Sequence, residues 1–155
     1  MKENKCLEFK ATITNTFLKT VSAYSNFGDG EIWFGVNDDG TVCGIENHEQ
    51  VCLVMENRIN DSISPKPDFE LKLDDSNKII KLVVKEGEYK PYLYKGKAYR
   101  RSDTASIEVD QAELKSLVLE GSNLSFEEIV TKAQSYLDST ELYFCLESIH
   151  NLAMN

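Results

Sequence analysis

The chain has 155 residues, of which 41% are hydrophobic and 28% are charged, which is typical of one globular domain rather than of a disordered or fibrous chain. No apolar run approaches the roughly 20 residues that span a bilayer, and the N-terminus lacks the apolar stretch of a signal peptide, so we expect a cytoplasmic protein without membrane contact. The formal net charge of −9 argues against nucleic acid as a partner unless the cations gather in one place.

The first 45 residues predict a strand, a helix and a hairpin. Residues 7–12 alternate apolar and charged side chains as a strand does, and residues 14–28 have apolar positions at helical spacing, with Gly28 where a C-terminal cap belongs. A short β-rich run at 31–36 leads through an Asp-Gly turn into a second strand at 41–45.

The next segment predicts a second helix and a strand pair. Asn47 and Gln50 have the spacing of a capping box, and the prolines after Ile63 end the helix. Its expected buried stripe consists of Val51, Val54, Met55, Ile59 and Ile63. Residues 69–84 then alternate apolar and polar side chains on both sides of the turn DDSN, which predicts an antiparallel pair.

Cations are concentrated shortly after this pair. Residues 81–101 hold seven basic and two acidic side chains, whereas residues 102–155 hold two basic and ten acidic ones. The segment 91–101 predicts a hairpin that turns at Lys95-Gly96 and places tyrosines among the basic residues. If the chain binds phosphates, we expect it to do so here.

Beyond residue 106 the pattern becomes helical. Asp110 and Glu113 form a second capping-box pair, and further helices are expected at 124–137 and 139–153. The last of these has no stop signal, which suggests that the chain is a fragment of a longer protein. The acidic tail and the unfinished helix both suit a protein partner, for example a second copy in a homodimer.

The glycines of the first half do not form a phosphate loop. Gly28-x-Gly30 follows a helix instead of preceding one, and the only Gly-Lys pair continues into alanine, so ATP binding is not favoured. The simpler interpretation is that Gly28 and Gly30 provide positive φ at a turn. The cysteine and histidine spacing predicts no metal site.

Five stretches stand in an order found in the Schlafen/AlbA-like domain family. They are ENKCLEFK at 3–10, TVSAYSN at 20–26, GDGEIWFGVNDDGTVCGI at 28–45, NRINDSISPKP at 57–67 and EYKPYLYKGKAYRRSDTAS at 88–106. The chain resembles this family from Glu3 to about Ser106. It departs from the pattern at Asp29, where the family usually has a second adjacent glycine, and at Asn37, which interrupts a Val-Asp-Asp signature.

The resemblance implies an α+β fold with a mixed or antiparallel β-sheet and packed helices, in a domain covering residues 1–121 with a helical extension at 122–155. It implies nucleic-acid binding, with DNA expected over RNA, at the N-terminal side of a bacterial transcriptional regulator. A winged-helix segment often follows in relatives. The expected residues of the family's central turn are Asn26, Gly28, Gly30, Gly35, Asp38 and Gly40.

The candidate nucleic-acid-binding residues lie in the basic segment. Lysine and arginine would contact phosphates while tyrosines stack on unpaired bases. These residues are Lys90, Tyr92, Tyr94, Lys95, Lys97, Tyr99, Arg100 and Arg101. Equally, the lysines could protect a hairpin edge from unwanted pairing while the tyrosines cover the sheet.

A metal-dependent ribonuclease is the alternative that the resemblance implies, because eukaryotic Schlafen relatives cut RNA with three carboxylates. Glu3, Glu8 and Asp38 are the matching positions, and such carboxylates hold Mg²⁺ or Mn²⁺ beside a scissile phosphate. A regular strand would send Glu3 and Glu8 to opposite faces, so a bend near residues 4–6 is required. Otherwise Glu8 is a polar strand residue and Asp38 a turn former.

Overall fold

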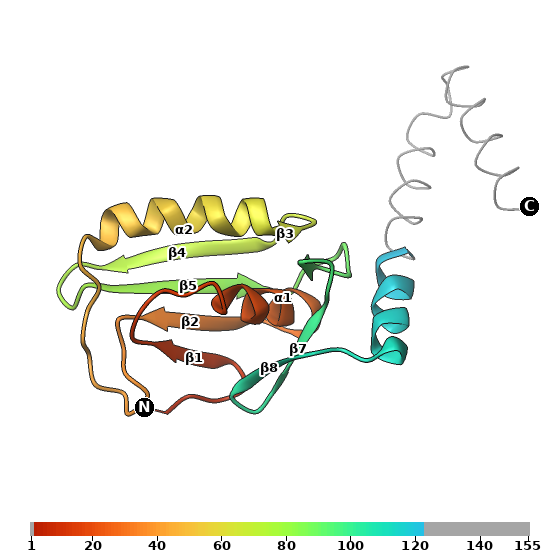
Figure 1. Cartoon of the computed structure of the whole chain (residues 1–155), viewed down its shortest axis with the longest axis horizontal. Helices are drawn as coiled ribbons and strands as arrows, with labels where there is room; N and C mark the ends of the chain where they lie inside the picture. Colours follow the sequence, from red (N-terminus) through yellow and green to blue (C-terminus); the bar gives the residue numbers. More distant parts are fainter. Residues whose placement is uncertain (1, 123–155) are drawn as a thin grey trace, which may run out of the picture.

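The computed structural model describes residues 2–122 (Figure 1). Its elements in chain order are β1 (Leu7–Lys10), α1 (Phe17–Phe27), β2 (Gly30–Phe34), α2 (His48–Ser62), β3 (Ile63–Ser64), β4 (Asp68–Asp74), β5 (Ile79–Lys85), β6 (Leu93–Tyr94), β7 (Tyr99–Ser102) and β8 (Ala105–Glu108). A further helix covers 111–122. The helices predicted at 124–137 and 139–153 lie outside the described residues.

The main sheet has four strands in the order β1-β2-β5-β4. β1 and β2 are parallel, whereas β2 with β5 and β5 with β4 are antiparallel. Two small antiparallel pairs, β3-β6 and β7-β8, complete the β-structure. The predicted α+β class with a mixed sheet is therefore confirmed, and within residues 2–122 no helix is long and apolar enough to cross a membrane.

Both long helices pack on one face of this sheet. In Figure 1 α1 lies in front of the central strands and α2 runs along β4. The core on this face joins Phe17 of α1 and Met55 of α2 to Ile32 and Leu82 of the two central strands, which lie opposite each other in the register. A smaller cluster around Phe9 occupies the other face.

The end of α1 confirms one glycine prediction and corrects another. Gly28 is the C-cap, and its N–H donates to the Tyr24 carbonyl over 3.1 Å. Gly30, however, lies in β2 and does not have positive φ. It is needed for a different reason, since a Cβ there would lie 2.3 Å from atoms of the Tyr24 ring.

The loop after β2 forms the predicted turn but only part of the predicted hairpin. Gly35 and Gly40 have φ of 96° and 89°, and the pairing is a single bridge between Val36 and Val42 instead of a second strand. The turn is stabilised by Asp39, whose carboxylate accepts the Thr41 N–H over 2.9 Å. Asp38, the aspartate expected to shape it, is exposed.

The start of α2 differs from the predicted capping box. Asn47 is the N-cap residue but has φ of 52°, and its side chain makes no capping hydrogen bond. A capping side chain reaches the helix from an extended backbone, so the left-handed backbone removes that geometry. Met55 and Ile59 are buried as predicted, whereas Val54 is 54% exposed.

The strand pair β4-β5 forms in full, with seven residue pairs from Asp68↔Lys85 to Asp74↔Ile79. The turn at Lys95-Gly96 is also confirmed, but its flanking strands do not continue as one hairpin. β6 pairs with β3 and β7 pairs with β8. The β7-β8 hairpin was not predicted.

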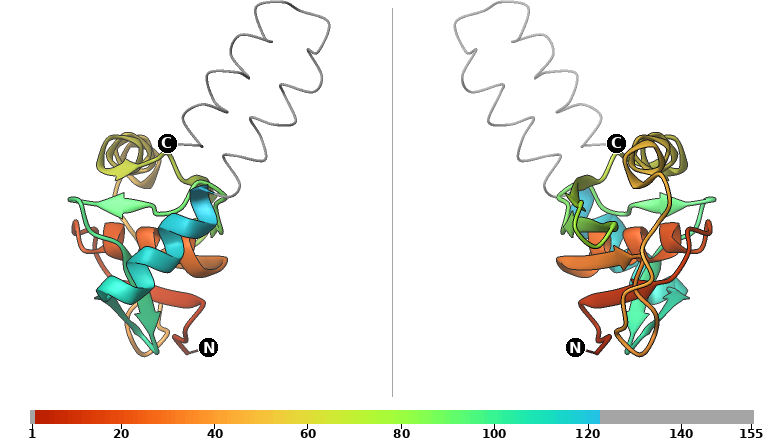
Figure 2. Two further views of the ribbon diagram at one scale, coloured as in Figure 1. Left: turned by 90° about the vertical axis from the view of Figure 1, so that its right-hand side faces the viewer. Right: turned by 90° about the vertical axis from the view of Figure 1, so that its left-hand side faces the viewer.

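The helix at 111–122 begins with the predicted capping box. The Glu113 N–H donates to the Asp110 carboxylate over 2.8 Å, and the Asp110 N–H donates to the Glu113 carboxylate over 3.2 Å. Leu117 is 1% exposed. Figure 2 shows this helix as a separate rod beside the β7-β8 hairpin.

Candidate nucleic-acid interface

A tight two-residue turn presents two lysines to solvent. Lys95 and Gly96 have φ of 50° and 75°, and backbone hydrogen bonds of 2.9 and 3.0 Å join Tyr94 to Lys97 across the turn. Positive φ at both central positions is the geometry of the turns that close hairpins. Lys95 and Lys97, on either side of Gly96, are both exposed.

Buried polar side chains of α1 hold both ends of this segment. The Asn26 amide accepts the Tyr92 N–H over 2.7 Å and donates to the Tyr92 carbonyl over 3.0 Å. The Ser22 hydroxyl donates to the same carbonyl over 2.8 Å and accepts the Tyr99 N–H over 3.2 Å. We call residues 94–97 the lysine turn. The hydrogen bonds of Asn26 therefore hold the lysine turn against α1, and they do not involve the glycines that follow α1.

The lysine turn and α1 together form a depression of about 360 Å³. It is lined by Asn15, Thr16, Lys19, Tyr94, Lys95, Lys97 and Tyr99. We call it the lysine depression. Its lining has three cations and no acidic side chain.

The charges of the lysine depression are largely free. Among the described residues Lys19 and Lys95 have no carboxylate partner; their ammonium groups lie 5.7 and 5.4 Å from the ring centres of Tyr99 and Tyr94. Lys97 is 3.7 Å from Glu108, and both side chains are more than half exposed, so solvent weakens this pair. The N-terminus of α1 lies at the same depression and has no acidic residue in its first turn, so its dipole adds positive potential.

The tyrosines do not act as predicted. Tyr92, Tyr94 and Tyr99 are 2%, 6% and 8% exposed and belong to the main core. Their rings pack beneath the lysine turn, and a ring buried on this scale has no open face for a base. Their burial fits the interpretation in which the tyrosines cover the sheet.

The other cations among the eight predicted residues are held by carboxylates. Lys90 lies 2.9 Å from Glu120, and Arg100 lies 3.0 Å from Glu113, so both contact the helix at 111–122. Arg101 is buried against Glu8. The eight predicted residues therefore do not share one exposed face, and only Lys95 and Lys97 remain available to a polyanion.

The predicted carboxylates do not assemble either. The chain does bend at residues 4–7, where two backbone hydrogen bonds join Asn4 to Leu7. Glu3 then accepts the Phe9 N–H over 2.7 Å, while a carboxylate oxygen of Glu8 lies 3.3 Å from the Arg101 guanidinium. Among residues 2–122, Glu3, Glu8 and Asp38 do not form a group whose ligand atoms lie within 4.8 Å of one another.

These contacts do not fit Mg²⁺ or Mn²⁺. The positive charge beside Glu8 is supplied by Arg101 and by Lys10, whose ammonium lies 3.8 Å from the carboxylate. Arg101 also contacts the carbonyls of Asn4 and Lys5 and the Ser106 hydroxyl. A divalent ion would have to displace a buried guanidinium with several acceptors. The arrangement is that of a structural ion pair.

One group of potential metal ligands does exist among the described residues. It consists of His48, Glu49 and Asp75, with the His48 Nε2 atom 2.8 Å from the Asp75 carboxylate. Both carboxylates are exposed, and Lys78 lines the small pocket that contains His48 and Glu49. A hydrogen-bonded surface pair explains the geometry without an ion.

Sequence reasoning missed Lys19. The signal was present, because no acidic residue occurs between Phe9 and Gly28 while Lys10 and Lys19 do. A count of charges along the chain favoured residues 81–101 instead, since it cannot show that α1 and the lysine turn lie side by side.

The family model and one solved structure with a TM-score above 0.5 support the fold assignment. The crystal structure of the DIP2311 protein from Corynebacterium diphtheriae is 17% identical over 72% of this chain, with a TM-score of 0.51; the matched region is 26% of that protein, so this chain spans about a quarter of it. The N-terminal domain of a RecG-related protein from Nitrosomonas europaea is 22% identical over 72% of this chain and 84% of that domain, with a TM-score of 0.44. No curated protein sequence matches. The model of the Schlafen/AlbA_2 family matches residues 3–110, as the five ordered stretches predicted, and the chain therefore belongs to the Schlafen/AlbA_2 family.

Proposed function

We propose that this chain binds nucleic acid by holding the phosphate backbone in the lysine depression, and that it does so as the DNA-binding domain of a transcriptional regulator. Membership of the Schlafen/AlbA_2 family indicates a function related to nucleic acid. The observation that carries the proposal is that Lys19, Lys95 and Lys97 line one depression without an acidic residue.

The rigidity of the surface supports this role. Asn26 and Ser22 fix the lysine turn to α1 through four hydrogen bonds of 2.7 to 3.2 Å. The backbone that carries Lys95 and Lys97 therefore keeps its position relative to α1, so that only the lysine side chains have to be ordered when a ligand binds. Lysine is a flexible point charge, which suits contact with phosphates along a strand more than recognition of one base.

The negative charge of the whole chain does not remove this possibility. At physiological ionic strength charges are screened beyond about 8 Å, so a phosphate in the depression mainly senses its nearest groups. The carboxylates of Glu113 and Glu120 are already paired with Arg100 and Lys90. The local potential is thus set by the three lysines and the start of α1, reduced by Glu108, whose exposed carboxylate lies 3.7 Å from Lys97.

The proposal is tested with the full chain and a fluorescently labelled DNA strand at low salt. The double variant Lys95→Ala/Lys97→Ala should weaken binding about 5- to 30-fold, if each lost surface contact contributes about 0.5–1 kcal/mol. The control is Lys66→Ala/Lys72→Ala, which removes two exposed lysines that do not line the depression. Equal losses in both variants, or none in the first, would refute the proposal.

A further inference from the structure

A groove beside α2 is distinct from the lysine depression. Its volume is about 900 Å³, within the range of about 300–1,000 Å³ typical of ligand sites. Its apolar walls are Ile13, Ile45, Val51, Val54 and Met55, and its polar lining includes Asn47, Gln50 and Arg58. We call it the α2 groove.

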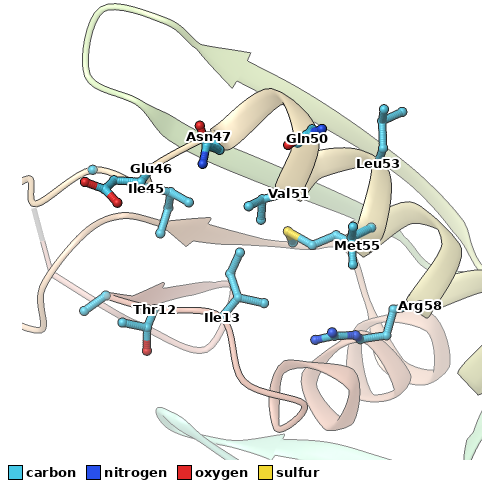
Figure 3. Close-up of a pocket in the computed structure, with 13 residues that line it drawn as sticks. Thr12, Ile13, Ile45, Glu46, Asn47, Gln50, Val51, Leu53, Met55 and Arg58 are labelled. Atoms are coloured by element: carbon cyan, nitrogen blue, oxygen red, sulfur yellow. The ribbon is translucent and has the colours of Figure 1, made fainter.

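Figure 3 shows how these side chains are directed. Val51, Met55 and Arg58 extend from α2 toward Ile13 on the loop before α1, while Glu46 lies at the opposite end of the groove from Arg58. Arg58 is half-buried, and no carboxylate of the described residues lies within ion-pair distance of it. A partly buried cation without a partner favours an anionic group on whatever occupies this groove.

The α2 groove and the lysine depression are separated by a single short loop. Ile13 lines the groove, and Asn15 lines the depression. Two residues span at most about 7 Å of chain, so one ligand can contact both sites. The unpaired cation of the groove thereby extends the cationic lining of the depression.

From this juxtaposition, and resting on the proposed function, we propose that the α2 groove takes an unpaired base of a nucleic-acid strand whose phosphates lie on the lysines and Arg58. The faces of a base are apolar enough to lie between Ile13, Val51 and Met55. Its edge carries donors and acceptors that the amides of Asn47 and Gln50 can pair with. The ligand is accordingly a single strand or an unpaired segment, because a base in a duplex is stacked and unavailable.

The α2 groove can accept a base, which the buried tyrosines cannot stack on. Tyr92, Tyr94 and Tyr99 have less than a tenth of their surface exposed, whereas the α2 groove is open and next to the same lysines. A protein partner would need a broad contact area, whereas the α2 groove has a volume of about 900 Å³, the scale of a small-ligand site. Phosphate contacts alone predict equal binding of strands with and without bases, and this difference makes the proposal testable.

The test compares two labelled strands of equal length and charge, one carrying thymine bases and one made of abasic sugar-phosphate units. The wild-type full chain should bind the base-bearing strand about fivefold or more tightly than the abasic strand. Val54→Trp fills the groove from a position that is 54% exposed, so folding should tolerate it. It should reduce this preference to near one without changing affinity for the abasic strand.

The matched control is Val118→Trp, another helical valine, which is 44% exposed and does not line the groove; it should keep the wild-type preference. A wild-type chain that binds both strands equally would overturn the base site while leaving phosphate binding intact, as would Val54→Trp with an unchanged preference. Lys95→Ala/Lys97→Ala should weaken both strands alike. If the wild type binds neither strand, the proposed function and this inference both fall.

Discussion

Removing the Glu8 carboxylate should destabilise the fold far more than a surface change does. The Glu8 and Arg101 side chains are 9% and 3% exposed, with 3.3 Å between the carboxylate oxygen and the guanidinium nitrogen. This pair joins β1 to β7, and the Arg101 side chain also contacts the turn at residues 4–5 and β8. Glu8→Leu keeps most of the volume but leaves a buried positive charge without its counter-ion.

The loss of unfolding free energy depends on the hydrogen-bond acceptors that Arg101 keeps in Glu8→Leu. Breaking a buried pair by removing one partner costs about 3–5 kcal/mol. Arg101 would keep three neutral acceptors, namely the carbonyls of Asn4 and Lys5 and the Ser106 hydroxyl, so we expect about 3 kcal/mol, the lower end. For a chain of this size such a loss lowers Tm by roughly 6–12 °C.

The assay is urea unfolding followed by circular dichroism, with thermal unfolding as a second measurement. Glu70→Ala is the control, since Glu70 is exposed on β4 and should change the free energy of unfolding by less than about 0.5 kcal/mol. The double variant Glu8→Leu/Arg101→Met should be more stable than Glu8→Leu, because it removes the unpaired charge. A Glu8→Leu variant within about 1 kcal/mol of wild type would refute the structural role of this ion pair.

Three further outcomes are expected. The Tyr24 hydroxyl is buried without a hydrogen-bond partner among the described residues, and burial raises its pKa, so Tyr24→Phe should leave the stability to urea unchanged or raise it by about 1 kcal/mol. Tyr92→Phe is the matched comparison, because the Tyr92 hydroxyl accepts a backbone N–H over 3.2 Å, and it should lower the free energy of unfolding by about 1 kcal/mol. A Tyr24→Phe variant less stable than Tyr92→Phe would contradict the statement that, of these two hydroxyls, only that of Tyr92 is hydrogen-bonded within residues 2–122. Gly30→Ala should cost about 1–3 kcal/mol in the same assay, because its Cβ would meet the Tyr24 ring, and an unchanged midpoint would show that the ring moves freely. The Glu86 N–H donates to the Asp29 carboxylate and holds the pKa of Asp29 below the usual range. This stabilisation is present above about pH 4, roughly the pKa of an unfolded aspartate, and is lost as the pH falls through the folded pKa. Asp29→Asn should therefore be less stable to urea than wild type at pH 7, and the difference should shrink as the pH falls below about 4; a difference that does not change with pH would contradict this role.

Much of the fold could be predicted because local patterns and long-range packing agree. The alternation in residues 69–84 predicts β4-β5, since one face of that pair is buried. The Asp110-Glu113 spacing predicts a helix start that needs only local contacts. The β7-β8 hairpin was missed because Ala105–Glu108 has weak alternation, with no buried residue among its four. Its position is fixed by the buried pairing of Arg101, which is a long-range contact.

The candidate site was predicted less well, because side-chain chemistry does not reveal burial. Tyr92 and Arg101 have side chains suited to nucleic acid but lie in the interior. The Tyr92 N–H donates to the Asn26 amide, and the Arg101 guanidinium donates to the Glu8 carboxylate. Lys95 and Lys97 were identified because glycine in a lysine-rich turn predicts exposure. The absence of acidic residues around Lys19 was visible in the sequence, but its place beside Lys95 and Lys97 depends on tertiary packing.

The salt dependence of binding tests the central claim most directly. For the wild-type chain and a DNA strand, the logarithm of the association constant should fall linearly with the logarithm of salt concentration, with a slope of about −0.7 per phosphate contact for a single strand. Lys95→Ala/Lys97→Ala should make that slope shallower by about 1.4, while Lys66→Ala/Lys72→Ala should leave it unchanged. A slope near zero for the wild type, or the same slope for all three proteins, would contradict the account.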